Sequence, residues 1–286
     1  MKPSLKQHIA QAMGKEVSSA VPVSGGDISL AYKIDLEGEG LFCKYHKGAQ
    51  GFAMLEAEKR GLEAIAATGT IRTPQVMHLG KLDHGACLLL EYVERGHPSD
   101  QSMARFGEQL AGLHTYKHSS FGWDTDNFIG SLTQTNTPRK TWPEFYAAER
   151  LSPQLRMACD KGLLSRDEVP GENLMEARLR DLCSETRPSL IHGDLWGGNY
   201  LISTRGEGYL IDPSVSYSHP GMDLAMSRLF GGFSPAFYSG YASAASDLMP
   251  EQDEIELYQL YYLLVHLNLF GLSYAGSVKR ILRRFF

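Results

Sequence analysis

The fold is decided by the stretch Leu190-Ile191-His192-Gly193-Asp194-Leu195-Trp196-Gly197-Gly198-Asn199, which Tyr209-Leu210-Ile211-Asp212-Pro213 follows after a short gap. In both segments an apolar run leads into a polar turn, which is typical of a short strand that ends at a loop. Phosphoryl transfer from ATP needs one carboxylate that accepts the proton of the attacking hydroxyl, and hard oxygen ligands for Mg²⁺. The pattern therefore predicts Asp194 as the catalytic base, and Asn199 and Asp212 as metal ligands.

This interpretation has a plain alternative. An Asp five residues before an Asn arises by chance, and the same letters fit a loop Asp, a turn Asn and a helix-capping Asp. The phosphoryl-transfer hypothesis therefore requires that the other parts of an ATP site occur upstream, in order.

Length and composition indicate an ordinary globular protein. The chain has 286 residues, of which 43% are hydrophobic and 21% charged, so we expect one large domain or two lobes that share a cleft. A formal net charge of -5 argues against a general nucleic-acid binder. The sequence predicts neither a signal peptide nor a membrane span. Cys43, Cys87, Cys159 and Cys183 lie far apart, which fits reduced thiols, and we expect a cytoplasmic monomer.

A glycine turn near the N-terminus is a candidate phosphate cradle. Gly25 and Gly26 separate two strand-like runs, and glycine lets backbone N–H groups approach a phosphate closely. We expect the backbone of this turn and Ser29 to cover the phosphates of ATP. A plain hairpin turn is the alternative, since the pattern is not a full glycine-rich motif and Asp27 would repel phosphate.

A lysine and a glutamate on apolar surfaces follow this turn. Lys44 lies in the apolar strand 41–45, and Glu58 shares the buried face of the helix expected over 51–67. A carboxylate on a buried stripe is costly unless it is paired, so we expect an ion pair with Lys44. Glu56, on a neighbouring face, is the weaker candidate.

The apolar run 86–90 predicts a core strand that ends in polar residues. In the kinase interpretation it is the last strand of the small lobe, and backbone groups of Glu91, Tyr92 and Val93 bind adenine. We place the lobe boundary near Gly96, which gives an N-terminal nucleotide-binding lobe over 1–96 and a catalytic and substrate-binding lobe over 97–286.

Further along, hydrophobic periodicity predicts mostly helices. We expect them over 4–19, 101–116, 153–184 and 255–271. His114 is expected to be structural. Asp223 begins a helix, so we expect it to act as a cap, although in kinase-like folds an Asp at this place often supports the catalytic loop.

The string 192–199, with Trp196 inside it, resembles the catalytic loop of the fructosamine (ketosamine) kinase family. That family belongs to the protein-kinase-like group, which also holds aminoglycoside and choline kinases. The run Leu229-Phe230-Gly231-Gly232-Phe233 resembles the same family. The resemblance implies an α+β, bilobal protein-kinase-like fold, with a small N-terminal lobe of antiparallel sheet and one main helix, and a larger, mostly helical C-terminal lobe.

The resemblance also implies which residues lie beside the substrate. The loop over 119–142 matches a family segment that is rich in amides and aromatic residues, so we expect Asn127, Gln134 and Asn136 to contact the sugar; a surface loop is the alternative. Trp196 could abut a sugar or an amine, or pack in the core. His192 is expected to hold the loop by hydrogen bonds, and it is a weaker candidate for substrate contact.

The implied activity is ATP- and Mg²⁺-dependent phosphorylation of a ketosamine, of the ribulosamine or fructosamine type, on the sugar 3-hydroxyl. The acceptor would be a small-molecule ketosamine or a glycated lysine side chain of a protein. Two alternatives remain at this point: a kinase of the same fold for an aminoglycoside, choline or homoserine, and a pseudokinase-like module that binds nucleotide without chemistry.

Overall fold

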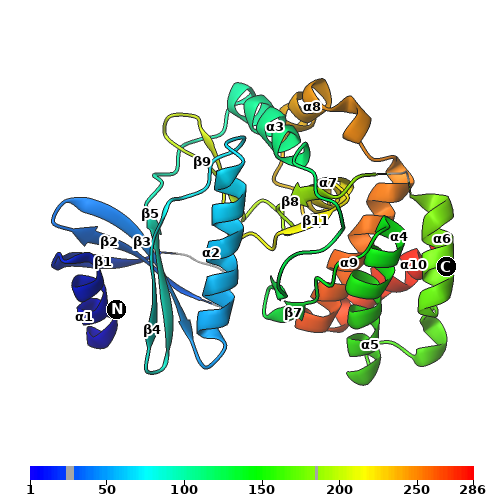
Figure 1. Cartoon of the computed structure of the whole chain (residues 1–286), viewed down its shortest axis with the longest axis horizontal. Helices are drawn as coiled ribbons and strands as arrows, with labels where there is room; N and C mark the ends of the chain where they lie inside the picture. Colours follow the sequence, from blue (N-terminus) through cyan, green and yellow to red (C-terminus); the bar gives the residue numbers. More distant parts are fainter. Residues whose placement is uncertain (24–28, 184–185) are drawn as a thin grey trace.

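The computed structural model describes residues 1–23, 29–183 and 186–286. Figure 1 shows a sheet lobe and a helical lobe side by side, with the long helix α2 between the sheet and the helical lobe. This arrangement confirms the predicted α+β, bilobal protein-kinase-like fold. Within the described ranges no helix is both long and apolar enough to cross a lipid bilayer.

The N-terminal lobe is a five-stranded antiparallel sheet with a helix on each face. In space its strands follow the order β1-β2-β3-β5-β4. Its elements are α1 (Pro3–Met13), β1 (Val17–Val23), β2 (Leu30–Leu36), β3 (Glu39–Lys47), α2 (Gly51–Ala67), β4 (Val76–Leu82) and β5 (Gly85–Glu91).

Alternation along β3 sorts its side chains between the two helices. Leu41, Cys43 and Tyr45 belong to the core under α1, whereas Phe42 packs in the core under α2. Because successive side chains of a strand point to opposite faces, Lys44 must point toward α2. The period of the strand thus directs the lysine to the helix that carries Glu58.

The predicted N-terminal helix over 4–19 is too long. The helix ends at Met13 because Gly14, at φ 65°, adopts the left-handed conformation that commonly terminates helices. The chain then enters β1, which pairs with β2.

Within the described residues, the C-terminal lobe is built from helices and three two-stranded sheets. The strand pairs are β6 with β7, β8 with β11, and β9 with β10. Its elements are α3 (Asp100–His114), β6 (Asn127–Ile129), β7 (Leu132–Gln134), α4 (Trp142–Phe145), a π-helical segment (Tyr146–Leu151), α5 (Ser152–Asp160), α6 (Glu172–Leu182), β8 (Ser189–Ile191), β9 (Tyr200–Ile202), β10 (Gly208–Leu210), β11 (Ser216–Ser218), α7 (Gly221–Leu229), α8 (Pro235–Ala244), α9 (Gln252–Phe270) and α10 (Ala275–Phe285). Three 3₁₀ turns complete the lobe: Arg166–Glu168, Ser246–Leu248 and Leu272–Tyr274.

The segment predicted as helical over 153–184 is two helices, α5 and α6. Gly162, at φ 69°, lies just beyond the end of α5, and Pro170 and Gly171 precede α6. The helices predicted over 101–116 and 255–271 are confirmed as α3 and α9, with small shifts of their ends.

Backbone hydrogen bonds attach the two lobes to each other. The N–H of Gly96 donates to the carbonyl of Ile202 at 2.8 Å, and the N–H of Leu210 donates to the carbonyl of Arg72 at 2.9 Å. The β9–β10 hairpin therefore lies against the linkers before β4 and after β5. The exact lobe boundary, predicted near Gly96, stays a prediction.

Candidate active site

Asp194 and Asn199 lie on one loop between β8 and β9. The Asn199 amide nitrogen donates to the Asp194 carbonyl oxygen at 2.9 Å and to the Asp194 carboxylate at 3.0 Å. Burial raises the pKa of the Asp194 carboxyl to about 7, and the negative charge of Asp212 acts in the same direction. A carboxyl tuned toward neutral pH is suited to accept a proton from a hydroxyl group.

The path of this loop depends on a glycine. Gly193 has φ 84°, and a Cβ built on it would lie 2.0 Å from the carbonyl oxygen of Ser214. The Ser214 N–H donates to the His192 carbonyl at 2.8 Å. Close approach of two backbone segments therefore brings the loop of Asp194 next to the segment that follows Asp212.

A buried carboxylate holds the same loop from behind. Asp223 accepts hydrogen bonds from the N–H groups of His192, at 2.7 Å, and Gly193, at 2.8 Å. His114 lies 3.2 Å from the same carboxylate and contacts the Tyr241 hydroxyl at 2.7 Å. The expected capping role of Asp223 is wrong, because its side chain supports the catalytic loop instead of bonding its own helix. The structural role expected for His114 agrees with its complete burial.

Asp212 enters the site from the turn after β10. Its φ of 54° places a non-glycine residue in the left-handed region, which costs energy and is found most often at functional sites. Its carboxylate pairs with the Lys44 ammonium, which also donates to Glu58 at 2.9 Å. The side chains of Lys44 and Glu58 are largely shielded from solvent, with exposed fractions of 13% and 10%.

The predicted pair of Lys44 and Glu58 is therefore present. Glu56, the weaker candidate, lies 3.7 Å from Arg60 on the solvent side of α2. The helix fits closely against the segment after Asp212, since a Cβ on Gly61 would lie 2.9 Å from the Pro213 ring. Movement of α2 would thus disturb Lys44 and Asp212 together.

One ammonium faces two carboxylates in this cluster. Burial alone lowers the pKa of Lys44, but the charges of Asp212 and Glu58 outweigh burial and raise it. Burial raises the pKa of Glu58. For Asp212 burial acts in the same direction, but the Lys44 charge outweighs it and holds the pKa of that carboxyl below its usual range. Asp212 is thus the more acidic of the two carboxyl groups that face Lys44.

The oxygen atoms at this point fit a divalent cation. Both hydrogen bonds of the Asn199 side chain use its amide nitrogen, so the amide oxygen is the atom it can offer a metal. Asp212 supplies an ionised carboxylate, and Asp194 adds negative charge nearby. Oxygen donors of this kind suit Mg²⁺, which also keeps waters and takes phosphate oxygens as ligands.

Of the residues predicted to bind nucleotide through the glycine turn and the strand β5, the structure describes only some. The Glu91 N–H donates to the Gln75 carbonyl at 2.8 Å, so this donor is already used inside the lobe. Tyr92 and Val93 are half-buried directly after β5, and adenine contact by the backbone groups of Glu91, Tyr92 and Val93 stays a prediction. Ser29 precedes β2 and is half-buried. Gly25 and Gly26 lie outside the described residues.

The amide residues predicted to touch the sugar are placed differently. Asn127, Gln134 and Asn136 are at most 5% exposed. Gln134 donates to Asn127 at 2.8 Å and accepts from the Tyr261 hydroxyl at 2.5 Å, and Asn136 donates to Asn127 at 2.9 Å. Their amide groups bond within the protein and shape the segment beside the active site, and their contact with substrate stays a prediction.

His192 and Trp196 have opposite environments. His192 is fully buried, and its ring lies 2.8 Å from the Ile211 carbonyl, which agrees with its expected role of holding the loop by hydrogen bonds. Trp196, two residues after Asp194, is 41% exposed, and its contact with substrate stays a prediction.

Sequence reasoning missed the residues that support the site from the large lobe. Arg150 is buried, and it donates to the Thr135 carbonyl, the Asn136 side chain and the Ser216 hydroxyl. The Tyr262 hydroxyl donates to the Gly193 carbonyl at 3.2 Å. An arginine and tyrosines inside apolar helical patterns are weak signals, because such residues also occur at helix edges with their polar ends in water.

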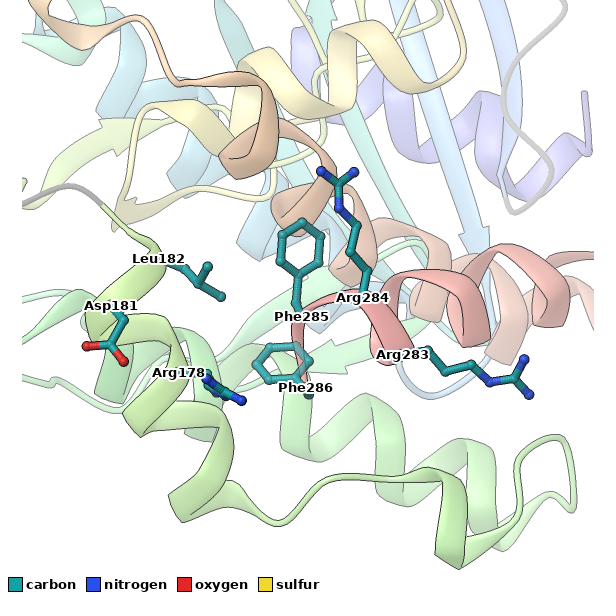
Figure 2. Close-up of a pocket in the computed structure, with 7 residues that line it drawn as sticks. All are labelled: Arg178, Asp181, Leu182, Arg283, Arg284, Phe285 and Phe286. Atoms are coloured by element: carbon teal, nitrogen blue, oxygen red, sulfur yellow. The ribbon is translucent and has the colours of Figure 1, made fainter.

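A separate hollow of about 350 Å³ lies between α6 and α10 (Figure 2). Its lining combines arginines with the last two aromatic residues of the chain: Arg178, Asp181, Leu182, Arg283, Arg284, Phe285 and Phe286. Arg284 already pairs with Asp253 at 2.6 Å. None of the seven is a predicted site residue, so the chemistry described above does not use this hollow.

Comparison with known proteins agrees with the geometry. A family model described as fructosamine kinase matches residues 1–286. A probable ketoamine kinase of Synechocystis is 37% identical over 98% of this chain and 95% of its own length. A mouse ketosamine-3-kinase is 31% identical over 91% of this chain and 92% of its own.

A solved structure from Thermobifida fusca, provisionally named a fructosamine-3-kinase, superposes with a TM-score of 0.83 at 32% identity, covering 99% of this chain and 98% of its own. Since the family model and these relatives span nearly the whole length, the chain belongs to the fructosamine kinase family.

Proposed function

We propose that this protein transfers the γ-phosphoryl group of ATP to the 3-hydroxyl of a ketosamine, the Amadori-type product of a sugar and an amine. The observation that carries the proposal is the meeting of Lys44, Glu58 and Asp212 beside the loop that holds Asp194 and Asn199. Family membership and the names of the relatives, ketoamine and ketosamine-3-kinase, supply the acceptor class.

In the proposed reaction Asp194 orients the acceptor hydroxyl and takes its proton as the oxygen attacks phosphorus. A pKa of about 7 lets this carboxyl be ionised before the attack and protonated after it. Lys44, fixed by Glu58, grips the α- and β-phosphates. Catalysis in this site depends mainly on positioning and on neutralising charge.

Asn199 and Asp212 would hold Mg²⁺, which when bound neutralises phosphate charge and orients the γ-phosphoryl group. Trp196 is placed to lie against the sugar or the amine of the substrate. Phosphorylation at the 3-hydroxyl would destabilise the adduct and release the amine, so the activity would repair glycation.

Three finer assignments accompany the proposal. ATP is the expected donor and a monomer the expected state. The four cysteines are unpaired thiols in the structure, which suits the reducing cytoplasm that we propose as its location.

The test is a phosphorylation assay with ATP and Mg²⁺ on one ribulosamine and one fructosamine, with an aminoglycoside, choline and homoserine as comparison acceptors. ADP release should occur with a ketosamine, and NMR should place the phosphate on O3. ADP release only with a comparison acceptor would assign a different kinase activity. Stabilisation by nucleotide without ADP release on any acceptor would indicate a binding module.

A further inference from the structure

Exposed apolar side chains gather on the large lobe beside the catalytic loop. In the part of the chain that the structure describes, nine large apolar side chains are exposed, and four of them are Trp196 at 41%, Phe230 at 41%, Phe270 at 55% and Leu272 at 65%. We call these four residues and His266 the aromatic row. Isolated exposed apolar residues are ordinary, but a gathered set beside a site indicates a binding surface.

Ring contacts connect Phe230, His266 and Phe270, and a backbone approach brings the loop of Trp196 beside the loop of Phe230. Gly197, next to Trp196, is so close to Gly232 that a Cβ on it would lie 3.3 Å from the Gly232 Cα. The Phe230 ring lies 4.5 Å from the His266 ring, and His266 lies 5.4 Å from Phe270, centroid to centroid. The row therefore extends from the loop that carries Trp196 to the end of α9.

The loop over 229–233 holds Phe230 in this exposed place. Gly231 and Gly232, at φ 74° and 96°, adopt conformations that other residues reach only with strain. The Tyr200 hydroxyl donates to the Gly232 carbonyl at 2.7 Å, and Tyr200 directly follows the metal ligand Asn199. This segment, which resembles the family but takes no part in phosphoryl transfer, thus joins Phe230 rigidly to the catalytic loop.

Helix α9 sets the direction and the length of the row. The Tyr262 hydroxyl touches the catalytic loop at Gly193, and Tyr262, His266 and Phe270 recur every four residues on one helix face. At 1.5 Å per residue, Phe270 lies about 12 Å further along the helix than Tyr262. Exposure increases in that direction, from 1% at Tyr262 to 55% at Phe270.

This length exceeds what a free sugar adduct can reach. In a ketosamine the amine nitrogen is four bonds from the 3-hydroxyl oxygen, about 5 Å when extended, given bonds near 1.5 Å. In a glycated lysine the Cα is nine bonds from that oxygen, about 11 Å when extended. With the hydroxyl at Asp194, the lysine Cα would therefore lie about 11 Å away, which is close to the rise of about 12 Å along α9 from Tyr262 to Phe270.

We propose that the aromatic row docks the polypeptide that flanks a ketosamine-bearing lysine side chain, so that the preferred acceptor is protein-bound rather than free. The inference rests on the proposed function, because it needs the acceptor hydroxyl at Asp194. Trp196 takes the sugar–amine end, Phe230 the lysine stem, and Phe270 with Leu272 the apolar side chains next to the lysine.

The experiment compares two acceptors on the full-length enzyme. One is a free ketosamine on a small amine; the other is a peptide in which the same sugar is carried by a lysine between apolar residues. The variant carries F270S and L272S together. L174S is the matched control, since Leu174 is 47% exposed on α6 and lies outside the row.

We expect the double substitution to raise the KM for the peptide about tenfold, the effect of losing two apolar contacts at a small interface. The KM for the free ketosamine and both kcat values should stay within about twofold, and L174S should change none of them.

Three results would overturn the inference. An unchanged KM for the peptide would remove the docking role while the proposed function stands. An equal rise in both KM values would place the residues in the sugar site, and a change of oligomeric state on size exclusion would make the row an interface between copies of the chain. Wild-type enzyme that phosphorylates neither acceptor would refute the proposed function and the docking role together.

Discussion

Replacing Asp223 by asparagine tests how the catalytic loop is held. The carboxylate is completely buried, and it accepts hydrogen bonds from the N–H groups of His192 and Gly193. Since a carboxylate only accepts, His114 must present its Nε2–H to Asp223, which leaves Nδ1 to accept from the Tyr241 hydroxyl. Asparagine has the same shape but offers one acceptor oxygen and one donor nitrogen.

The expected magnitude follows from this loss of acceptors. In D223N one backbone N–H faces an NH₂ group, which leaves a buried donor unsatisfied, and the remaining bonds lose the assistance of the negative charge. Each such loss costs about 1–3 kcal/mol, so we expect the free energy of unfolding to fall by about 3 kcal/mol. For a chain of this size that corresponds to a drop in Tm of roughly 6–9 °C.

Activity should fall for the same reason. The N–H groups that Asp223 holds belong to the two residues directly before Asp194, and a displacement of the base by 1 Å can cost about 10²-fold in rate. We expect kcat to fall by about that factor, with a small change in the KM for ATP. Thermal denaturation and steady-state kinetics measure the two effects.

The pH dependence gives a further check. Burial raises the pKa of Asp223, but the hydrogen bonds from His114 and from the Gly193 N–H outweigh burial, so the pKa of Asp223 lies below its usual value. A lowered pKa in the folded state stabilises the protein above the unfolded-state pKa, near 3.9, and the contribution is lost as pH falls through the folded-state pKa. The difference between wild type and D223N should therefore be constant from pH 6 to 8 and decrease below about pH 4.

The matched control is D253N. Asp253 pairs with Arg284 on the surface and its side chain is 62% exposed, so its replacement should cost less than about 1 kcal/mol. If D223N melts within 2 °C of wild type and keeps its kcat, the support that we assign to Asp223 is wrong.

Three further predictions concern the ion pair, the base and a buried histidine. D194N should bind nucleotide, seen as an unchanged ATP-induced rise in Tm, while phosphoryl transfer falls by about 10³-fold or more; near-normal turnover would contradict the assigned base. E58Q should raise the KM for ATP about tenfold, because Lys44 loses a charged partner. The control E56Q changes a residue on the exposed side of α2 and should leave this KM unchanged. Equal effects of the two substitutions would refute the pairing of Lys44 with Glu58. Burial lowers the pKa of His219 to about 4, although the charge of Glu254 opposes this. Between about pH 6.5 and pH 4 the unfolded chain therefore binds more protons than the folded chain. The free energy of unfolding of the wild type should fall as the pH is lowered through this range, by about 2 kcal/mol at pH 5. H219Q should lack this acid-side slope in urea denaturation, and a parallel loss in both proteins would exclude His219 as its source.

Much of the active site could be predicted from local patterns. Lys44 was identifiable because it interrupts an apolar strand, and Glu58 because it interrupts the apolar face of an amphipathic helix; both positions are costly without a partner. The order Asp194, Asn199 and Asp212 was likewise readable, because each residue directly follows or belongs to a turn after a short apolar strand.

The loop over 119–142 shows where local patterns fail. A segment rich in Asn, Gln and Thr predicts an exposed polar loop, yet the side chains of Asn127, Gln134 and Asn136 are buried. Their partners, Arg150 and Tyr261 among them, come from helices distant in sequence, so no local signal distinguishes a satisfied interior amide from one that faces substrate.

The sequence by itself determined the resemblance to fructosamine kinases, which implied the two-lobe fold, and it predicted the residues of phosphoryl transfer, because turn chemistry and hydrophobic periodicity act over a few residues. Only the tertiary structure decided that Asp223 supports the catalytic loop, that the polar loop is interior, and that exposed aromatic residues continue from Trp196 to the end of α9. Those outcomes depend on contacts between segments that can be more than a hundred residues apart in sequence. Which polar groups are buried, and which hydrogen bonds they make, is decided only when the whole chain packs.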